Sequence, residues 1–453
     1  MLEGFTINNG EKITKKSVRG ILGVQHVIAM FGATVLVPLL TGLNPGVALF
    51  SAGLGTLIFH FVTKKKVPVF LGSSFAFIPV IIAVASMYGS FGSAEYAVGL
   101  QYAQGGIIVA GALYILMSGL ILVFGADKIK SFFPPVVTGP MIVVIGLVLC
   151  PVALEMASSN WLIAIITLST VVAVSVFGKG MWKVVPILCG VVAGYIASAL
   201  MGVIDYTAIS QANWIQVPQF TLPKFDLAAI AVIAPVVLAT FMEHIGDITT
   251  NGAVVGKNFF KDPGLHRTLL GDGLATMIAG FIGGPANTTY GENTSVLAVT
   301  KVYDPSILRL AAVFAITMSF VGKIGAILLT IPAAVMGGVS IVLFGMIASV
   351  GIRTIANADI DFNNNRNLII TSLILVIGIG TEILKIKSGL FLADGSQAFT
   401  GSIGIKITDS IQIVGLSLAA IIGIVSNKIL PESIAVSTSE KEEMIEALKV
   451  ETA

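Results

Sequence analysis

The chain is a succession of apolar runs separated by short polar segments, and these segments carry most of the charged residues. About 20 consecutive apolar residues are what an α-helix needs to cross the hydrocarbon core of a bilayer. Windows of about 19 residues predict fourteen such spans, near 20–40, 46–63, 67–87, 103–125, 133–152, 160–177, 184–203, 228–247, 268–285, 288–300, 306–322, 331–350, 367–381 and 408–427. The pattern therefore predicts an all-α polytopic membrane protein.

Lysine and arginine fall mainly on one side of these spans. With the N-terminus in the cytoplasm, all but five of the 26 basic residues lie on the cytoplasmic side, the exceptions being Lys224, Lys323, Lys385, Lys387 and Lys406. Cytoplasmic loops of membrane proteins are enriched in these residues, so the bias predicts an orientation with both termini in the cytoplasm. Residues 1–19 and 429–453 are expected to be cytoplasmic tails, and no cleaved signal peptide is expected.

The spans divide into two halves of similar layout. The longest outside loops, 204–227 and 382–407, suggest a division after the seventh span, and an odd number of spans per half gives an inverted repeat. Small and hydroxyl residues interrupt the third span at "FLGSSFAFIP" (70–79) and the tenth at "NTTYGEN" (287–293). Paired interruptions of this kind indicate a transporter's central binding site, although small residues also serve close helix packing.

Composition agrees with a membrane protein. The chain is 55% hydrophobic and 11% charged, whereas soluble domains carry about 25% charged residues. The net charge of +2 gives no reason to expect a nucleic-acid partner. No Cys/His spacing suggests a metal site, and no Gly-rich loop followed by Lys suggests nucleotide binding. We therefore expect no metal or cofactor, and coupling to an ion gradient rather than to ATP.

Few carboxyl groups fall within the predicted spans, and they include Glu243, Asp247, Asp272 and Glu292. A charge at this depth costs at least about 2.5 kcal/mol, so such residues usually serve a pathway or a relay. Glu243 and Asp247 are four residues apart and share a helix face. Because two carboxylates on one face repel each other, at least one of the two groups can be neutral or charged near pH 7. Such a group is what a proton-coupled step requires. The alternative for Asp247 is a hydrated position at the end of its span. His26 and His244 are interpreted as packing residues.

Several segments closely resemble the nucleobase–cation symporter family, also called the nucleobase–ascorbate transporters, and within it the bacterial uracil permeases. They are "QHVIAMFGATVLVPLLTGLNP", "LGSSFAFI", "DPGLHR", "GGPANTTYGEN" and "IPAAVMGGVSIVLFG". The resemblance implies 14 transmembrane spans in two inverted 7-span repeats, with short extended segments in spans 3 and 10. It also implies a core domain of spans 1–4 (20–126) and 8–11 (228–330), and a gate domain of spans 5–7 (127–227) and 12–14 (331–428).

The same resemblance implies a proton-coupled symporter that imports uracil by alternating access, and dimerisation through gate-domain spans. Phe75 would offer its backbone and its ring to the base, and Glu243 would bind one edge. Gly291 and Glu292 would meet the opposite edge. The implied pocket walls are Ala33, Tyr290 and Phe344, and the implied proton-coupling residues are Glu243, Asp247, Asp272 and Glu292.

Four positions depart from the uracil-type pattern. Ser295 stands where the family usually has glycine, and Phe344 replaces a tyrosine of close relatives. Asp247 replaces a histidine, and Asp272 stands where some relatives have asparagine. Aspartate at position 247 is common in purine-type relatives, so a xanthine or urate transporter is the alternative. The run Tyr290, Gly291 and Glu292 favours uracil.

Two other classes of protein agree less well with the sequence. An anion channel or exchanger can share such an architecture, but an anion site would favour basic residues or bare helix N-termini, and this chain has carboxylates at the corresponding depth. An intramembrane enzyme lacks support, because the sequence shows neither a Ser/Lys or Ser/His pairing nor an HExxH motif.

Overall fold

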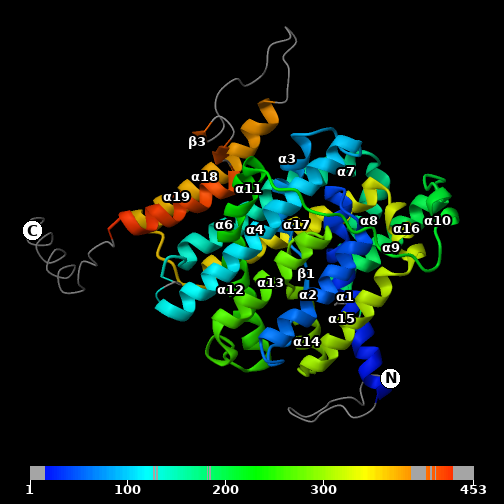
Figure 1. Cartoon of the computed structure of the whole chain (residues 1–453), viewed down its shortest axis with the longest axis horizontal. Coiled ribbons are helices and arrows are strands. Elements are labelled where there is room, and N and C mark those ends of the chain that lie inside the picture. Colours follow the sequence, from blue (N-terminus) through cyan, green and yellow to red (C-terminus); the bar gives the residue numbers. More distant parts are fainter. Residues whose placement is uncertain are drawn as a thin grey trace, which may run out of the picture.

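The computed structural model describes residues 16–125, 128, 131–180, 182, 185–388, 405–408, 411–413 and 415–431. The described part is mostly helical (Figure 1). Its first elements are α1 (Lys16–Thr41), α2 (Pro45–Val62), β1 (Leu71–Ser73), η1 (Phe75–Phe77), α3 (Ile78–Ser86), α4 (Ala94–Phe124), α6 (Pro135–Val148), α7 (Cys150–Ser158), α8 (Trp161–Phe177), α9 (Pro186–Leu200) and α10 (Thr207–Gln211).

The second part of the chain repeats this mixture of long helices and short segments. Its elements are α11 (Leu227–Ile233), η3 (Ala234–Val236), α12 (Val237–Val255), η4 (Phe260–Gly264), α13 (Leu265–Ile282), β2 (Asn287–Thr289), α14 (Gly291–Thr300), α15 (Pro305–Ser319), α16 (Gly322–Leu329), α17 (Ala333–Asn357), α18 (Asn365–Ser388), β3 (Ile405–Thr408), β4 (Ile411–Ile413) and α19 (Gly415–Ile429). Most of the two predicted tails and of the loop 382–407 lies outside the described residues.

Six helices of the described part are long and apolar enough to cross a membrane. They are Val18–Thr41, Pro45–Val62, Ala94–Phe124, Pro135–Ser158, Leu227–Val255 and Ala333–Asn357. Six further apolar helices are shorter, including Trp161–Phe177 and Pro305–Ser319. The molecule is therefore a polytopic helical membrane protein.

Local sequence sets where many helices begin. The side chain of Asn44 accepts a hydrogen bond from the Val47 amide at 3.1 Å, and Pro45 occupies the first turn of α2. Ser93 caps α4 and Asp226 caps α11 in the same way. An N-cap oxygen satisfies an amide that has no partner inside the helix, and proline is preorganised for the first turn. Such caps fix the helix starts next to the loops.

The helices pack into two groups. In the first, α13 packs extensively on α4 and α2, and α15 packs on α2 and α1. In the second, α17 packs on α6, α7 and α8, while α18 packs on α19 and α6. Small residues permit the closest approaches. A Cβ on Gly111 of α4 would lie 2.7 Å from the Gly273 oxygen of α13, and one on Gly146 of α6 would lie 2.5 Å from the Phe344 oxygen of α17. Membrane helices commonly associate through such residues.

Several predicted spans differ from the observed helices; the span predicted near 408–427, for example, contains β4 before α19 begins at Gly415. The span predicted near 228–247 is α11, the 3-10 turn η3 with Pro235, and α12, which continues to Val255. Asp247 therefore lies inside a helix rather than at its end. The span predicted near 133–152 is divided at Leu149 into α6 and α7, just before Pro151. Proline lacks an amide hydrogen and disturbs the preceding helical turn. A proline can therefore interrupt a span as Gly, Ser and Thr do.

Candidate functional site

Two short strands from distant parts of the chain meet near the middle of the molecule (Figure 1). β1 and β2 pair antiparallel, with Leu71 opposite Thr289 and Ser73 opposite Asn287. Further backbone hydrogen bonds extend the pairing by one step on each side, from Ser74 N to Ala286 O at 2.8 Å and from Tyr290 N to Phe70 O at 3.0 Å. The extended segments expected at 70–79 and 287–293 are thus confirmed.

Neighbouring helices satisfy backbone groups of these strands. The Leu71 amide donates to Thr56 Oγ1 of α2 at 2.9 Å. Asn287 donates its side-chain amide to Ser51 O of α2 at 3.1 Å, and the Asn287 carbonyl accepts from Thr276 of α13 at 2.8 Å. Non-helical backbone is tolerated at membrane depth only where protein or a wet cavity satisfies it. α2 and α13 therefore form the frame that permits two spans to be broken here.

A helix starts directly after each strand. η1 and α3 follow β1 from Phe75, and α14 follows β2 from Gly291. The first amides of a helix have no intrahelical partner and carry a partial positive charge. The strand pair therefore brings two helix N-termini to one region, an arrangement typical of binding sites in broken transporter helices.

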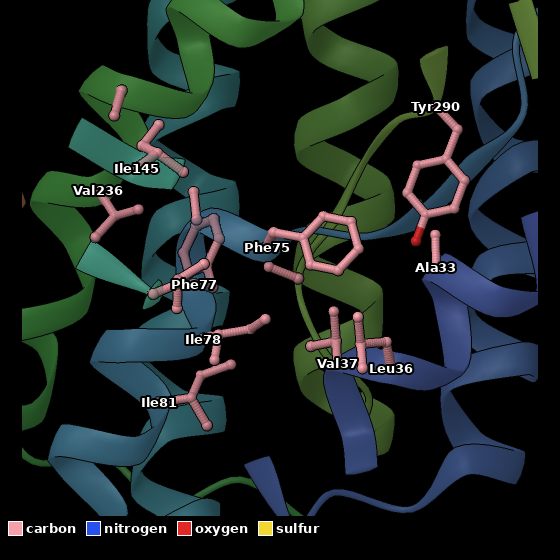
Figure 2. Packing of buried hydrophobic residues seen from close by; sticks show 14 of the residues in the cluster. Ala33, Leu36, Val37, Phe75, Phe77, Ile78, Ile81, Ile145, Val236 and Tyr290 are labelled. Atoms are coloured by element: carbon pink, nitrogen blue, oxygen red, sulfur yellow. The ribbon is translucent and has the colours of Figure 1, made fainter. Parts of the chain in front are cut away.

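Aromatic and small side chains surround this region (Figure 2). Ala33 of α1 is fully buried, and the hydroxyl end of Tyr290 is directed toward it. The rings of Phe75 and Phe344 form a T-shaped pair with centroids 6.4 Å apart. Tyr290 is held by a hydrogen bond from its hydroxyl to Ser73 O at 3.0 Å. Four residues that the resemblance assigns to the binding site, Ala33, Phe75, Tyr290 and Phe344, therefore belong to one buried cluster.

Two glutamates, Glu243 and Glu292, lie near each other. Glu243 of α12 is half-buried, and its Oε2 atom is buried without a hydrogen-bond partner among the described residues. Glu292 is half-buried in the first turn of α14, close enough for its charge to act on Glu243. Next to it, Gly291 faces open space, since a Cβ there would meet no atom within 4 Å. These groups offer carboxylate acceptors and a bare backbone to a small ligand.

The two aspartates have protein partners. Thr289 Oγ1 of β2 donates to Asp247 Oδ2 at 2.9 Å. Asp272 Oδ2 lies 3.1 Å from His244 Nδ1, and the other ring nitrogen of His244 lies 3.1 Å from Thr268 Oγ1. Asp247 is thus tied to the strand, whereas Asp272 is tied to a buried histidine. Asp247 lies within α12 and is half-buried, so its hydrogen bond to Thr289 is made at the edge of the buried region.

His26 and Ser295 make local polar contacts. The His26 ring lies 3.1 Å from the side-chain nitrogen of Asn293 in α14, so this histidine of α1 is hydrogen-bonded to a neighbouring helix. Ser295 is exposed, and its hydroxyl donates to Gly291 O at 3.1 Å. No close helix approach therefore requires a glycine at that position.

Several polar residues that support the site were not among the predicted site residues. Asn251 of α12 donates to Pro68 O at 3.0 Å and to Thr294 Oγ1 at 3.1 Å. Ser73 donates to Thr34 O of α1 at 3.0 Å. The sequence contains no clear signal for them, because their partners lie far away in the chain.

A separate cavity of about 290 Å³ opens elsewhere, between the N-terminus of α2, α10 and α16. Gln211, Gln216 and Gln219 are among its lining residues. It contains none of the acidic residues described above, so it is distinct from the candidate site.

A model of the permease family matches residues 19–386 of the chain. Among characterised sequences, the chain is 43% identical to the uracil permease of Bacillus caldolyticus over 425 residues, which are 90% of this chain and 91% of that protein. It is 40% identical to the probable uracil permease of Haemophilus influenzae, over 92% of this chain and 95% of that protein. These matches extend over both halves of the site.

The fold also resembles that of a solved anion transporter. The murine Solute Carrier 26 family member A9, in its inward-facing state, matches 93% of this chain and 69% of its own with a TM-score of 0.63. The sequences are 11% identical, so the likeness concerns the fold alone.

Proposed function

Because the chain belongs to the permease family known as the nucleobase–ascorbate transporters, we propose that it is a proton-coupled symporter that imports uracil across the cytoplasmic membrane. The relatives named as uracil permeases support this substrate. The observation that carries the proposal is the Glu243 carboxylate, which has a buried oxygen without a described protein partner and lies within electrostatic range of Glu292. The purine alternative has no comparable support.

Uracil fits the chemistry of the two sides of the site. Its ring N–H groups can donate to the carboxylates of Glu243 and Glu292. Its carbonyl oxygens can accept from backbone amides at the starts of η1 and α14, near Phe75 and Gly291. Binding sites for small molecules usually combine apolar walls with a few fixed polar groups. The flat walls would be formed by Ala33, Phe75, Tyr290 and Phe344.

Protons would be handled by Glu243, Asp247, Asp272 and Glu292. These carboxylates are near enough to repel one another, and ionising all of them in a poorly hydrated site is costly. Asp247 accepts a hydrogen bond from Thr289 of β2, so a proton arriving at Asp247 would act directly on the strand beside the pocket. This contact offers a physical route from protonation to substrate binding.

We propose that transport occurs by alternating access between a core domain (20–126 and 228–330) and a gate domain (127–227 and 331–428). The two packing groups of helices support this division, since α13, α4, α2 and α15 form one and α17, α6, α7 and α8 form the other. Fourteen spans in two inverted repeats, cytoplasmic termini and dimerisation through gate-domain spans complete the proposal. An impermeant maleimide would then label Lys323→Cys but not Lys65→Cys in intact cells.

The substrate is tested by uptake of labelled uracil into cells that lack their own uracil permease. We expect saturable uptake that unlabelled uracil suppresses and excess xanthine does not, and that a protonophore abolishes accumulation. Glu243→Gln should remove uptake, because an amide cannot replace both carboxylate acceptors. Uptake that persists with a protonophore would remove proton coupling from the proposal. Strong suppression by xanthine would replace uracil with a purine.

A further inference from the structure

His244 uses both ring nitrogens to hold α12 against α13. Nδ1 lies 3.1 Å from Asp272 Oδ2, and Nε2 lies 3.1 Å from Thr268 Oγ1. The side chains of His244 and Asp272 are both 0% exposed. Asp272 and Thr268 are four residues apart and share one face of α13. The ring is therefore fixed in position and orientation by two points on a single helix face.

The helix that holds this ring is itself firmly placed. α13 packs extensively on α4 and α2, with Gly273 against Gly111 of α4 and Gly271 against Phe59 of α2. By contrast, α12 packs mainly on α14, α6 and β2, and its backbone contacts with α13 are few. The polar contacts of His244 thus connect α12 to the rigid α2–α4–α13 frame across a sparse helix interface.

Glu243 has no comparable support. Its Oε2 atom is buried without a partner among the described residues, and the glutamate immediately precedes His244. Neighbouring residues on an α-helix point about 100° apart. When His244 is fixed toward α13, the direction of Glu243 is therefore fixed as well.

We propose that His244 is a positioning residue, which aims the Glu243 carboxylate into the binding site through its bonds to Asp272 and Thr268. The inference rests on the proposed function, since it concerns how that site is held before substrate arrives. It gives Asp272 a second role, as the acceptor or donor that orients the histidine. The free oxygen Oδ1 of Asp272 has no described partner, so the tie to His244 is the principal polar contact of this carboxyl group.

Three substitutions of His244 separate hydrogen bonding from shape. His244→Asn retains a polar group near the Nδ1 position and hence the contact with Asp272. His244→Gln retains one near the Nε2 position and hence the contact with Thr268. His244→Leu retains neither. In purified protein we expect His244→Leu to weaken uracil binding at least about tenfold, because a misplacement of about 1 Å can cost 10²-fold. We expect His244→Asn to remain within about threefold of the wild type.

The matched control is Tyr195→Phe. It removes a 2.8 Å hydrogen bond between Tyr195 and Thr330, which joins α9 to the end of α16 away from the site. This variant should lower the melting temperature without changing the Kd for uracil. A His244→Leu protein with lowered melting temperature and unchanged Kd would show that the histidine only stabilises the fold. Equal weakening by His244→Leu and His244→Asn would show that ring shape matters rather than its hydrogen bonds.

A second readout is independent of any ligand. Hydrogen–deuterium exchange across 239–247 of α12 should be faster in His244→Leu than in Tyr195→Phe, with exchange of α13 unchanged. If His244→Leu does not fold, Thr268→Val replaces it as the milder loss of one contact, and an unchanged Kd would then overturn the proposal. Failure of the wild type to bind uracil would reject the proposed substrate. The exchange comparison would still decide the role of His244, because equal exchange in His244→Leu and Tyr195→Phe would reject the positioning role.

Discussion

Alanine at Gly72 tests how closely β1 approaches Tyr290. A Cβ at this position would lie 2.3 Å from two carbon atoms of the Tyr290 ring and 2.7 Å from its hydroxyl oxygen. Carbon atoms in ordinary contact are about 3.5–4.0 Å apart, so the ring has to move by more than about 1 Å. The ring is 3% exposed and its hydroxyl donates to Ser73 O at 3.0 Å. The substitution cannot be accommodated without disturbing this buried contact.

The cost of Gly72→Ala follows from these contacts. Overpacking in a close-packed interior costs about 1–3 kcal/mol, and loss of the hydrogen bond from Tyr290 to Ser73 adds about 1 kcal/mol. We expect a total loss of about 2–4 kcal/mol in the free energy of unfolding. Because Tyr290 is also a proposed wall of the pocket, uracil binding should weaken at the same time.

The assay is the unfolding of purified protein in detergent, together with the Kd for uracil. Gly291→Ala is the control, since a Cβ at Gly291 would meet no atom within 4 Å. It should leave the free energy of unfolding nearly unchanged and weaken only uracil binding, because its methyl group adds bulk at the site. In a Tyr290→Ala background, Gly72→Ala should cost little, since the clashing ring is gone. If the full cost persists there, the reasoning from the Tyr290 contact is wrong.

Three further predictions concern the support of the strands and an exposed ion pair. Thr56→Val should cost about 1–3 kcal/mol of stability in a thermal-unfolding series, because it leaves the first amide of β1 buried without its acceptor; Thr56→Ser should cost much less. Thr289→Val should alter the pH dependence of uracil uptake more than its maximum rate, since it removes the hydrogen bond that Thr289 donates to Asp247; an unchanged pH profile would separate Asp247 from the strand. Lys66→Met breaks the exposed 2.6 Å pair with Asp262, in which the lysine's hydrogen bond lowers the pKa of the aspartate below 3.8. A carboxyl group whose pKa is lowered by folding stabilises the fold at neutral pH, and this contribution is lost as the pH falls through the pKa of the folded state. The small difference in melting temperature between Lys66→Met and the wild type should therefore be seen at pH 7 and disappear in acid.

The location of the candidate site could be predicted because its residues are of types that apolar spans seldom contain. Apolar spans seldom contain Glu, or runs such as "GSS" and "NTT", so Glu243, Glu292 and the two interruptions stand out without any knowledge of the fold. The pairing of 71–73 with 287–289 is different in kind, because more than 200 residues separate the strands along the chain. The two interruptions lie in the third span of each predicted half, which indicated that both segments matter. The register of the strand pair, however, depends on the hydrogen bonds that α2 and α13 make with the two strands.

The supporting residues could not be predicted for a related physical reason. A histidine in an apolar span can be a ligand, a relay or a packing residue, and the choice depends on what faces its two nitrogens. For His244 those groups are Asp272 and Thr268, which are recognisable as a pair only after α12 and α13 are placed side by side. The boundary of α12 shows the same limit. The polar run after Asp247 suggested the end of a span, yet Asn251 finds Pro68 O and Thr294 inside the protein, and the helix continues to Val255.

These contacts divide the acidic residues of the site by what holds them. Asp247 and Asp272 each have one oxygen in contact with a protein donor or a histidine ring, although Asp272 Oδ1, like Glu243 Oε2, is buried without a partner among the described residues. A buried polar group without a partner costs about 1–3 kcal/mol, and a ligand that supplies the missing hydrogen bond recovers that energy on binding. In the proposed function, the free energy left unused at Glu243 is available to substrate, while the hydrogen bonds of Asp247 and Asp272 connect the site to β2 and to α13. Substitution of either aspartate should change how the site responds to protons, and substitution of Glu243 should change whether it binds a base.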